Sequence, residues 1–238
     1  ERYLNNEIEV FIKRLDLIDP FISGNKLFKL KHNVDRALLE KKNMLITFGG
    51  AFSNHILATA AYAKKKNIDC LAIVRGEEYS ELNPLLALAK EYGMNFCFVS
   101  RKEYAKRNDN NYVSELIRKY KKAFIVPEGG NNKLGVLGAE EILETQDKSF
   151  DYIICPIGTG ATLSGIVNSS NRSQKVIGIN CINDTKDINK NISQKTNKNN
   201  WEIINEFNFG GFAKFDNLLT EYLKKFKLNY KITLDLNY

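Results

Sequence analysis

The sequence has few of the residues that build metal sites and disulfide frameworks. It contains two histidines and four cysteines, and no two cysteines form a CxxC pair. Three of the cysteines lie inside apolar runs and the fourth ends such a run, so we expect buried, reduced thiols and no metal site. This scarcity excludes zinc-finger proteins and disulfide-rich secreted proteins.

Long apolar runs are also lacking. No window approaches the ~18 consecutive apolar residues of a membrane-spanning helix. Residues 1–9 lack the apolar core of a signal peptide, so we expect a cytoplasmic protein that does not bind membranes. The chain does not begin with Met and stops at Tyr238, and we interpret it as a fragment of a longer protein.

Positive charge is in excess but is not patterned for nucleic acid. The formal charge is +7 at pH 7, yet no basic stripe is interleaved with aromatic residues. The lysines lie in helix-like stretches such as 64–66, 119–122 and 224–227, among acidic and apolar positions, as on solvated helix faces. We expect no nucleic-acid partner, although the positive field could attract a small anionic molecule.

Short runs rich in Ile, Val and Phe alternate with stretches of helical period, which predicts an α/β fold with mostly parallel sheets. The expected strands are 44–48, 70–75, 95–99, 123–127, 151–156 and 175–181, with a further piece near 7–14. The expected helices are 27–41, 54–66, 84–92, 111–121, 134–145, 162–170 and 216–227. Residues 183–200 are almost entirely polar, and we expect a loop or solvated helix that buries little.

A glycine-rich segment follows one expected strand and begins the next helix. It reads PIGTGATLSG, so Gly158 and Gly160 free the backbone to expose N–H groups while Thr159 and Thr162 offer hydroxyls. Such a segment is typical of an anion cradle, or of a plain tight turn. It is not a P-loop, and Leu163 occupies the place of the third glycine of a dinucleotide fingerprint.

Two further segments place polar side chains where a strand gives way to a helix, the usual ligand site of an open α/β sheet. In FGGAFSNH, the residues Ser53, Asn54 and His55 stand at a helix start, where they could bind a carboxylate or merely cap the helix. In SGNKLFKLK, Lys26 follows Gly24 at another helix start. Most lysines are solvated surface charges, but the positive end of a helix lowers an amine's proton affinity, which suits a nucleophile.

Taken in order, the segments SGNKLFKLK, TFGGAFSNHI, VPEGGNNKLG, PIGTGATLSG and FGGFAK resemble the aminocyclopropane carboxylate deaminase and D-cysteine desulfhydrase family. The 27-residue spacing from Lys26 to Ser53 agrees with that family of fold type II pyridoxal phosphate enzymes, which are similar to the tryptophan synthase β chain. The resemblance implies two three-layer α/β domains with mostly parallel twisted sheets, a homodimer, and a small amino-acid substrate. The implied large cofactor domain is 1–40 plus 128–238, with its end missing, and the implied small inserted domain is 41–127.

The resemblance also implies residue roles. Lys26 would carry pyridoxal 5′-phosphate as an imine, and Asn54 would hydrogen-bond the cofactor's ring hydroxyl. Ser53 would lie near the reacting carbon and assist proton transfer. The residues implied to hold the phosphate are Gly158, Thr159, Gly160, Ala161 and Thr162. Those implied to contact the substrate are Ser53, Asn54, His55, Phe212 and Tyr238.

The identity of the substrate turns on a few positions. Aminocyclopropane carboxylate has no α-hydrogen, and family deaminases place a tyrosine near the site, whereas Phe212 at the corresponding place has no hydroxyl. The tripeptide SNH, in place of the SNQ of deaminases, also favours a desulfhydrase over a deaminase. We therefore expect β-elimination from D-cysteine to pyruvate, ammonia and sulfide, with ring opening to 2-oxobutyrate and ammonia as the alternative. The partner of the pyridine nitrogen would lie beyond Tyr238.

Two other hypotheses stay open. The chain could be a non-catalytic or decayed fragment that binds the cofactor, because Leu15 and Leu236 replace an expected Asp and Pro. It could also be a nucleotide-binding α/β module that uses the GTGAT segment for phosphate, but that hypothesis leaves SGNK and SNH unexplained.

Overall fold

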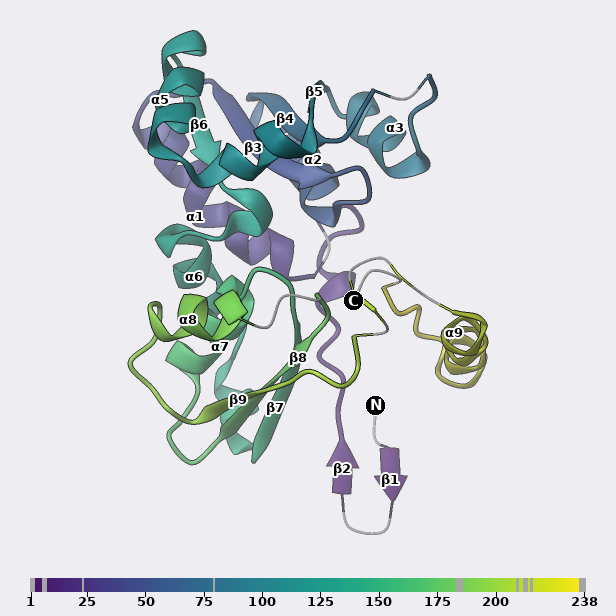
Figure 1. The fold of residues 1–238 in the computed structure, drawn as a ribbon. Coiled ribbons are helices and arrows are strands. Elements are labelled where there is room, and N and C mark those ends of the chain that lie inside the picture. Colours follow the sequence, from purple (N-terminus) through teal and green to yellow (C-terminus); the bar gives the residue numbers. More distant parts are fainter. Residues whose placement is uncertain are drawn as a thin grey trace.

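The computed structural model describes residues 3–5, 8–22, 24–78, 80–182, 186–208, 210–211, 214 and 216–235. Figure 1 shows two parallel sheets with helices around them, a short N-terminal hairpin and a C-terminal helix. The predicted α/β class with parallel sheets is confirmed. None of the helices in the described part of the chain has the length and apolarity that crossing a membrane requires.

The first sheet has four parallel strands in the order β5-β4-β3-β6. They are β3 (Met44–Gly50), β4 (Asp69–Arg75), β5 (Met94–Val99) and β6 (Ala123–Val126). One face is covered by α1 (Asn25–Leu39), α2 (Asn54–Lys66) and α3 (Pro84–Glu91), and the other by α4 (Arg101–Tyr104) and α5 (Asn110–Lys119). The middle strands are buried on both faces, so they read as continuous apolar runs.

The second sheet has three parallel strands, β7 (Tyr152–Ile157), β8 (Lys175–Asn180) and β9 (Trp201–Ile204). Its core is formed against α6 (Lys133–Glu140), α7 (Ala161–Ser169) and α8 (Lys186–Ser193). A Cβ on Gly165 would lie 2.5 Å from that of Ala139, so glycine is what lets α7 pack this closely on α6. On the other face Tyr152 and Ile154 are exposed, so within the described residues helices cover one side of this sheet.

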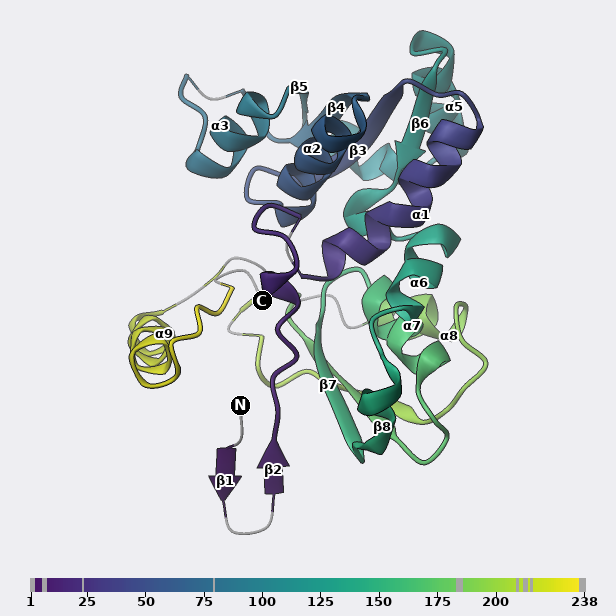
Figure 2. The same cartoon turned by 180° about the vertical axis from the view of Figure 1, so that it is seen from behind.

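Helix α1 runs between the two sheets, as Figures 1 and 2 show. Its buried residues Leu30, Val34 and Ala37 belong to the core beside the four-stranded sheet. On the other side, Gly138 of α6 packs against the carbonyl of Phe28. Helix α1 therefore packs on both sides, against the core of the four-stranded sheet and against α6. The expected domain boundary at residue 40 assigns α1 to the large domain, although it also contributes to the core of the small one. The division into domains stays a proposal.

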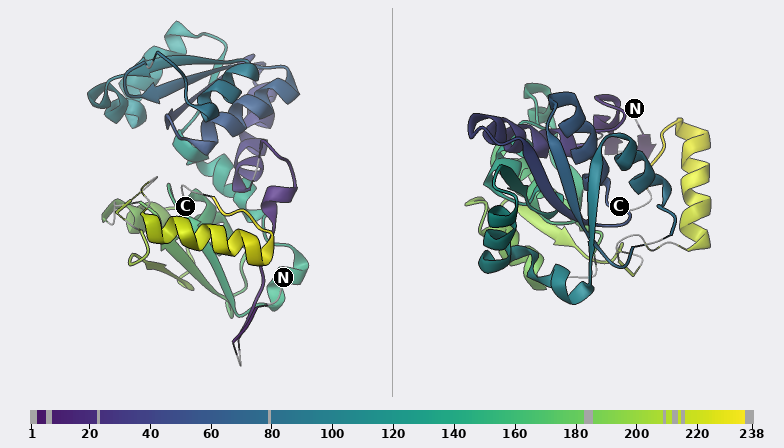
Figure 3. Two further views of the ribbon diagram at one scale, coloured as in Figure 1. Left: turned by 90° about the vertical axis from the view of Figure 1, so that its right-hand side faces the viewer. Right: turned by 90° about the horizontal axis from the view of Figure 1, so that it is seen from above.

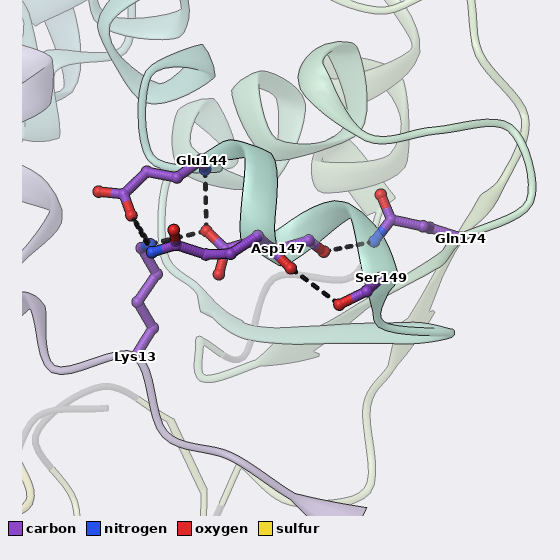
Figure 4. Close-up of polar contacts among 6 residues, drawn as sticks. Lys13, Glu144, Asp147, Ser149 and Gln174 are labelled. Carbon is purple, nitrogen blue, oxygen red and sulfur yellow. Dashed lines mark hydrogen bonds and ion pairs between the residues drawn. The ribbon is translucent and has the colours of Figure 1, made fainter.

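A polar network fastens the segment before α1 to the second sheet (Figure 4). The Lys13 ammonium lies 2.7 Å from the Asp147 carboxylate and 3.4 Å from that of Glu144. Asp147 belongs to η4 (Thr145–Ser149) and Glu144 is its N-cap residue. Gln174 donates to the Asp147 carbonyl at 2.8 Å. The network ties the N-terminal segment to the loop before β8.

The remaining elements are short or stand apart. They are β1 (Tyr3–Asn5), β2 (Ile8–Val10), the 3-10 turns η1 (Leu15–Leu17), η2 (Ala105–Asn108) and η3 (Glu128–Gly130), and α9 (Asn217–Tyr230). Figure 3 shows α9 at one side of the molecule, away from both sheets.

The polar segment 183–200 differs from the expectation that it buries little. It contains α8, in which Ile188 and Ile192 are 3 % and 0 % exposed and pack into the core of the second sheet. These two isoleucines are four residues apart and lie on one face of the helix, so a helix can bury them despite the polar composition around them. The expectation that this segment buries little was wrong, because it rested on the overall polar composition and not on the four-residue spacing of the two isoleucines.

Candidate functional site

A cavity of about 720 Å³ opens at the carboxyl ends of the strands of both sheets. Gly50 ends β3, Arg75 ends β4, and Gly158 follows β7. Ligands of open α/β sheets bind at this edge. The predicted site residues among those that line the cavity are Lys26, Ser53, Asn54, His55, Gly158 and Thr159. The structure thus brings three segments that are far apart in the sequence to one cavity.

Lys26 is the second residue of α1 and is 8 % exposed. Burial lowers the pKa of its amine to about 8, with the Asp235 carboxylate opposing the shift. The amine donates to the side-chain oxygen of Asn25 at 2.8 Å. Near neutral pH such an amine has a sizeable neutral fraction, which an exposed lysine lacks, and the neutral form is the nucleophile.

A second lysine lies one helical turn further and was not predicted as a site residue. Lys29 is 3 % exposed, and burial, with the charge of Lys26 adding to it, holds the pKa of its amine well below the usual value. A Cβ on Gly130 would lie 3.2 Å from that of Lys29, so the turn η3 passes close to it. The three-residue spacing from Lys26 was the sequence signal that could have found it.

Ser53 occupies the N-cap position of α2, as one interpretation of the sequence expected. Its side chain accepts no cap hydrogen bond from the described residues, so its hydroxyl is not used to cap the helix there. Asn54 donates to the Asp235 carboxylate at 2.5 Å. A Cβ on Gly49 would lie 2.7 Å from that of Ser53, so only glycine allows the strand to approach this residue so closely.

His55 is 2 % exposed, and neither ring nitrogen has a hydrogen-bond partner among the described residues. Burial, followed by the charges of Lys26 and Lys29, holds the pKa of its imidazole well below the usual value. The Pro127 backbone opposes this shift, but the imidazole is still neutral at pH 7. By strict geometry neither its donor nor its acceptor is satisfied by a described residue. A buried polar group in this condition favours a binding role over the alternative of a satisfied structural histidine.

The glycine-rich segment forms the floor of the cavity. Gly160 has a φ of 89° and precedes α7, and no side chain of the described residues caps the first N–H groups of that helix. The Thr159 hydroxyl is buried, and no hydrogen-bond partner for it exists in the described part of the structure. Uncapped amides and a buried hydroxyl without a partner fit a phosphate group.

One contact joins this cradle to the lysine. Asn25 donates from its side-chain nitrogen to the Thr162 hydroxyl oxygen at 2.6 Å, while its oxygen accepts from Lys26. Thr162 can still donate its own hydrogen to an anion. The residues present therefore fit a phosphorylated aldehyde cofactor: a neutral amine on one side and an anion cradle on the other, with Asn25 between them.

Not every predicted residue reaches the cavity wall. Gly160, Ala161 and Thr162 lie behind the wall that Gly158 and Thr159 form, at the start of α7. Phe212 and Tyr238 lie outside the described residues. Within the described residues, no three His, Cys, Asp or Glu side chains are placed to hold a metal ion.

Comparisons with known proteins agree with these features. The model of a family described as pyridoxal-phosphate dependent enzymes matches residues 2–201. A Thermotoga maritima protein with the provisional name 1-aminocyclopropane-1-carboxylate deaminase is 29% identical over 86% of this chain and 72% of its own. A Pyrococcus abyssi protein with the same provisional name is 30% identical, over 87% of this chain and 69% of its own.

The Arabidopsis thaliana bifunctional D-cysteine desulfhydrase/1-aminocyclopropane-1-carboxylate deaminase is 33% identical over 68% of this chain. This chain spans 45% of that protein and 50% of a Pyrococcus horikoshii relative, so it covers about half the length of these two. The crystal structure of an ACC deaminase homologue superimposes with a TM-score of 0.82 at 26% identity, and the match covers 97% of this chain and 76% of that one.

Proposed function

Because this chain belongs to the pyridoxal-phosphate-dependent enzymes, in the group of the aminocyclopropane carboxylate deaminases and D-cysteine desulfhydrases, we propose a specific role for its cavity. Lys26 binds the cofactor covalently, and the cavity carries out β-elimination from a small amino acid. D-cysteine is the expected substrate, which with water gives pyruvate, ammonia and hydrogen sulfide.

One observation carries the proposal: the Lys26 amine is buried, has a pKa of about 8, and is joined through Asn25 to the glycine-rich cradle. A solvated surface lysine would have none of these features. The nucleotide-binding hypothesis leaves this lysine unexplained, and the family match now speaks against it. A non-catalytic cofactor-binding protein remains the outcome to be distinguished by assay.

The side chains around the cavity have separate tasks. Bound pyridoxal phosphate would supply an electron-withdrawing ring that stabilises negative charge on the substrate's α-carbon. Lys26 Nζ is then the base that removes the α-proton, and Ser53, which lines the same cavity, relays a proton through its hydroxyl. Asn54 and the uncharged His55 orient the ligand by hydrogen bonds. Thr159 and the amides at the start of α7 hold the phosphate.

Opening of aminocyclopropane carboxylate to 2-oxobutyrate and ammonia is the second candidate. The relatives support it equally, because the Arabidopsis protein is named for both activities. We favour elimination because His55 follows Ser53 and Asn54, and because Phe212 has no hydroxyl to offer. The residues that contact the substrate, Phe212 and Tyr238 included, belong to this proposal.

The test is a paired assay on the cofactor-loaded protein. Sulfide and pyruvate are measured from D-cysteine and from L-cysteine, and 2-oxobutyrate from the cyclopropane substrate. The proposal predicts sulfide from D-cysteine at a rate that Lys26→Ala abolishes. Production of 2-oxobutyrate without sulfide would reverse the order of the two candidates, and no turnover by loaded protein would favour the non-catalytic hypothesis.

Assembly and location extend the proposal. We propose a homodimer in the cytoplasm. The family resemblance supports the dimer, and the four free cysteines are consistent with a reducing compartment. Light scattering of the loaded protein tests the first statement, and fractionation of the source cells tests the second.

A further inference from the structure

The cavity wall on the side of the four-stranded sheet is strongly basic. Arg75, Arg101 and Arg107 line the cavity there, and Lys214 lines it elsewhere. Among the described residues of the lining, Glu128 is the only acid. An amino acid with one carboxylate needs no such excess of positive charge, and the roles proposed above use none of the three arginines.

The fold places these arginines at one edge. Arg75 ends β4, Arg101 begins α4 directly after β5, and Arg107 lies in η2. In the sheet Arg75 pairs with Gly50, and its guanidinium nitrogen Nη2 lies 3.5 Å from the position of a Cβ on Gly50. The Ser53 amide donates to the Gly50 carbonyl at 3.0 Å. The Arg75 guanidinium is therefore next to the loop that carries Ser53.

One of the three arginines is already neutralised. Arg107 lies 2.6 Å from the Glu128 carboxylate, whose other oxygen accepts from the Tyr104 hydroxyl at 2.8 Å. Both Arg75 and Arg107 lie over the buried Tyr104 ring, 5.6 and 4.9 Å from its centroid. With described residues, neither Arg75 nor Arg101 forms an ion pair. Glu128 is thus occupied, and the guanidinium groups of Arg75 and Arg101 are left for a ligand.

We propose that the natural substrate carries a second anionic group on its side chain, a carboxylate or a phosphate, which Arg75 and Arg101 bind. The proposal rests on the elimination chemistry proposed above, but it replaces D-cysteine, whose side chain has neither a carboxylate nor a phosphate, as the natural substrate. The α-carboxylate lies with Ser53, Asn54 and His55, and the side chain points along Gly50 toward the guanidinium groups. Guanidinium groups match carboxylate and phosphate in shape and charge, and they reject a neutral side chain that leaves them unpaired.

The test compares matched ligands on the cofactor-loaded protein. Dissociation constants are measured from the change in visible absorbance, in both enantiomers, for aspartate against asparagine and for phosphoserine against serine. We expect the anionic member of at least one pair to bind about tenfold more tightly, the effect of one charge-assisted hydrogen-bond pair. The preference should shrink as salt is raised, because exposed charges are screened.

Variants assign the preference to its residues. Arg75→Gln together with Arg101→Gln should abolish the preference and leave the affinity for asparagine and serine unchanged. Arg118→Gln, on the exposed face of α5 outside the cavity, is the matched control and should change neither. The single variants Arg75→Lys and Arg101→Lys keep the positive charge. They serve as substitutes if the double variant folds poorly.

The outcomes are distinguishable. Equal affinity within both pairs, or variants that weaken neutral and anionic ligands alike, would overturn this inference while the proposed function stands. Failure of the protein to bind the cofactor at Lys26 would instead overturn the proposed function. A preference for aspartate identifies a dicarboxylic substrate, and a preference for phosphoserine identifies a phosphorylated one.

Discussion

Replacing Lys26 by methionine should stabilise the cofactor-free protein while destroying its function. Burial lowers the pKa of the Lys26 amine from 10.5 to about 8 in the folded chain. Each pKa unit corresponds to ~1.4 kcal/mol, so the charged amine opposes folding by about 3 kcal/mol at pH 7. Methionine has a similar volume and no charge, so Lys26→Met should raise the free energy of unfolding by up to that amount.

The destabilising effect of Lys26 on the folded chain should depend on pH. The folded-state pKa is depressed, so between about pH 8 and 10.5 the unfolded chain binds more protons at this residue than the folded chain does. The destabilisation by Lys26 is therefore complete below about pH 8 and disappears as pH rises toward 10.5. The advantage of Lys26→Met should shrink over the same range.

The assay is urea unfolding of the cofactor-free protein at pH 7 and at pH 10, followed by fluorescence. Lys90→Met, on the exposed face of α3, is the control and should change stability by less than about 0.5 kcal/mol at either pH. Equal stability of Lys26→Met and the parent at pH 7 would refute the reasoning, because the amine would then not be under strain from burial.

Three further predictions concern the cradle, the serine loop and the core. Thr159→Val replaces a buried hydroxyl, which has no described partner, by a methyl of similar size, so the stability of the cofactor-free protein should stay the same or rise. The affinity for the cofactor, measured by equilibrium dialysis, should fall about tenfold. Gly49→Ala places a Cβ 2.7 Å from that of Ser53 and should displace the serine. We expect kcat for elimination to fall at least tenfold while the cofactor stays bound. An unchanged kcat would show that Ser53 takes no part in the mechanism. Ile192→Ala should cost about 2–5 kcal/mol in urea unfolding, because Ile192 is 0 % exposed in the core of the second sheet, and a cost below ~1 kcal/mol would contradict that packing.

Local patterns were sufficient to predict the strands of the two parallel sheets other than β9, and the three segments that meet at the cavity. Continuous apolar runs indicated β3 and β4 because both faces of those strands are buried. Gly158 and Gly160 indicated the cradle because only a flexible backbone exposes consecutive amides. Lys26 stood at an expected helix start, but its role came from the family resemblance, and the structure adds its burial and its lowered pKa.

Contacts between distant segments could not be read from such patterns. The bond from Asn25 to Thr162 joins residues 137 positions apart, and no periodicity reports it. Arg75 looked like an ordinary polar end of a strand, and only the pairing of β3 with β4 places it beside Gly50. The strand β9 was missed because four residues after a polar segment give too short a signal.

Covalent binding of the cofactor by Lys26 can be tested by reducing the imine and mapping the modified lysine. Protein incubated with pyridoxal phosphate is reduced with borohydride, digested, and its modified lysines are located by mass spectrometry. We expect one dominant label, on Lys26, that grows as pH is raised through about 8. A dominant label on Lys29 or on a surface lysine, or no label at all, would contradict it.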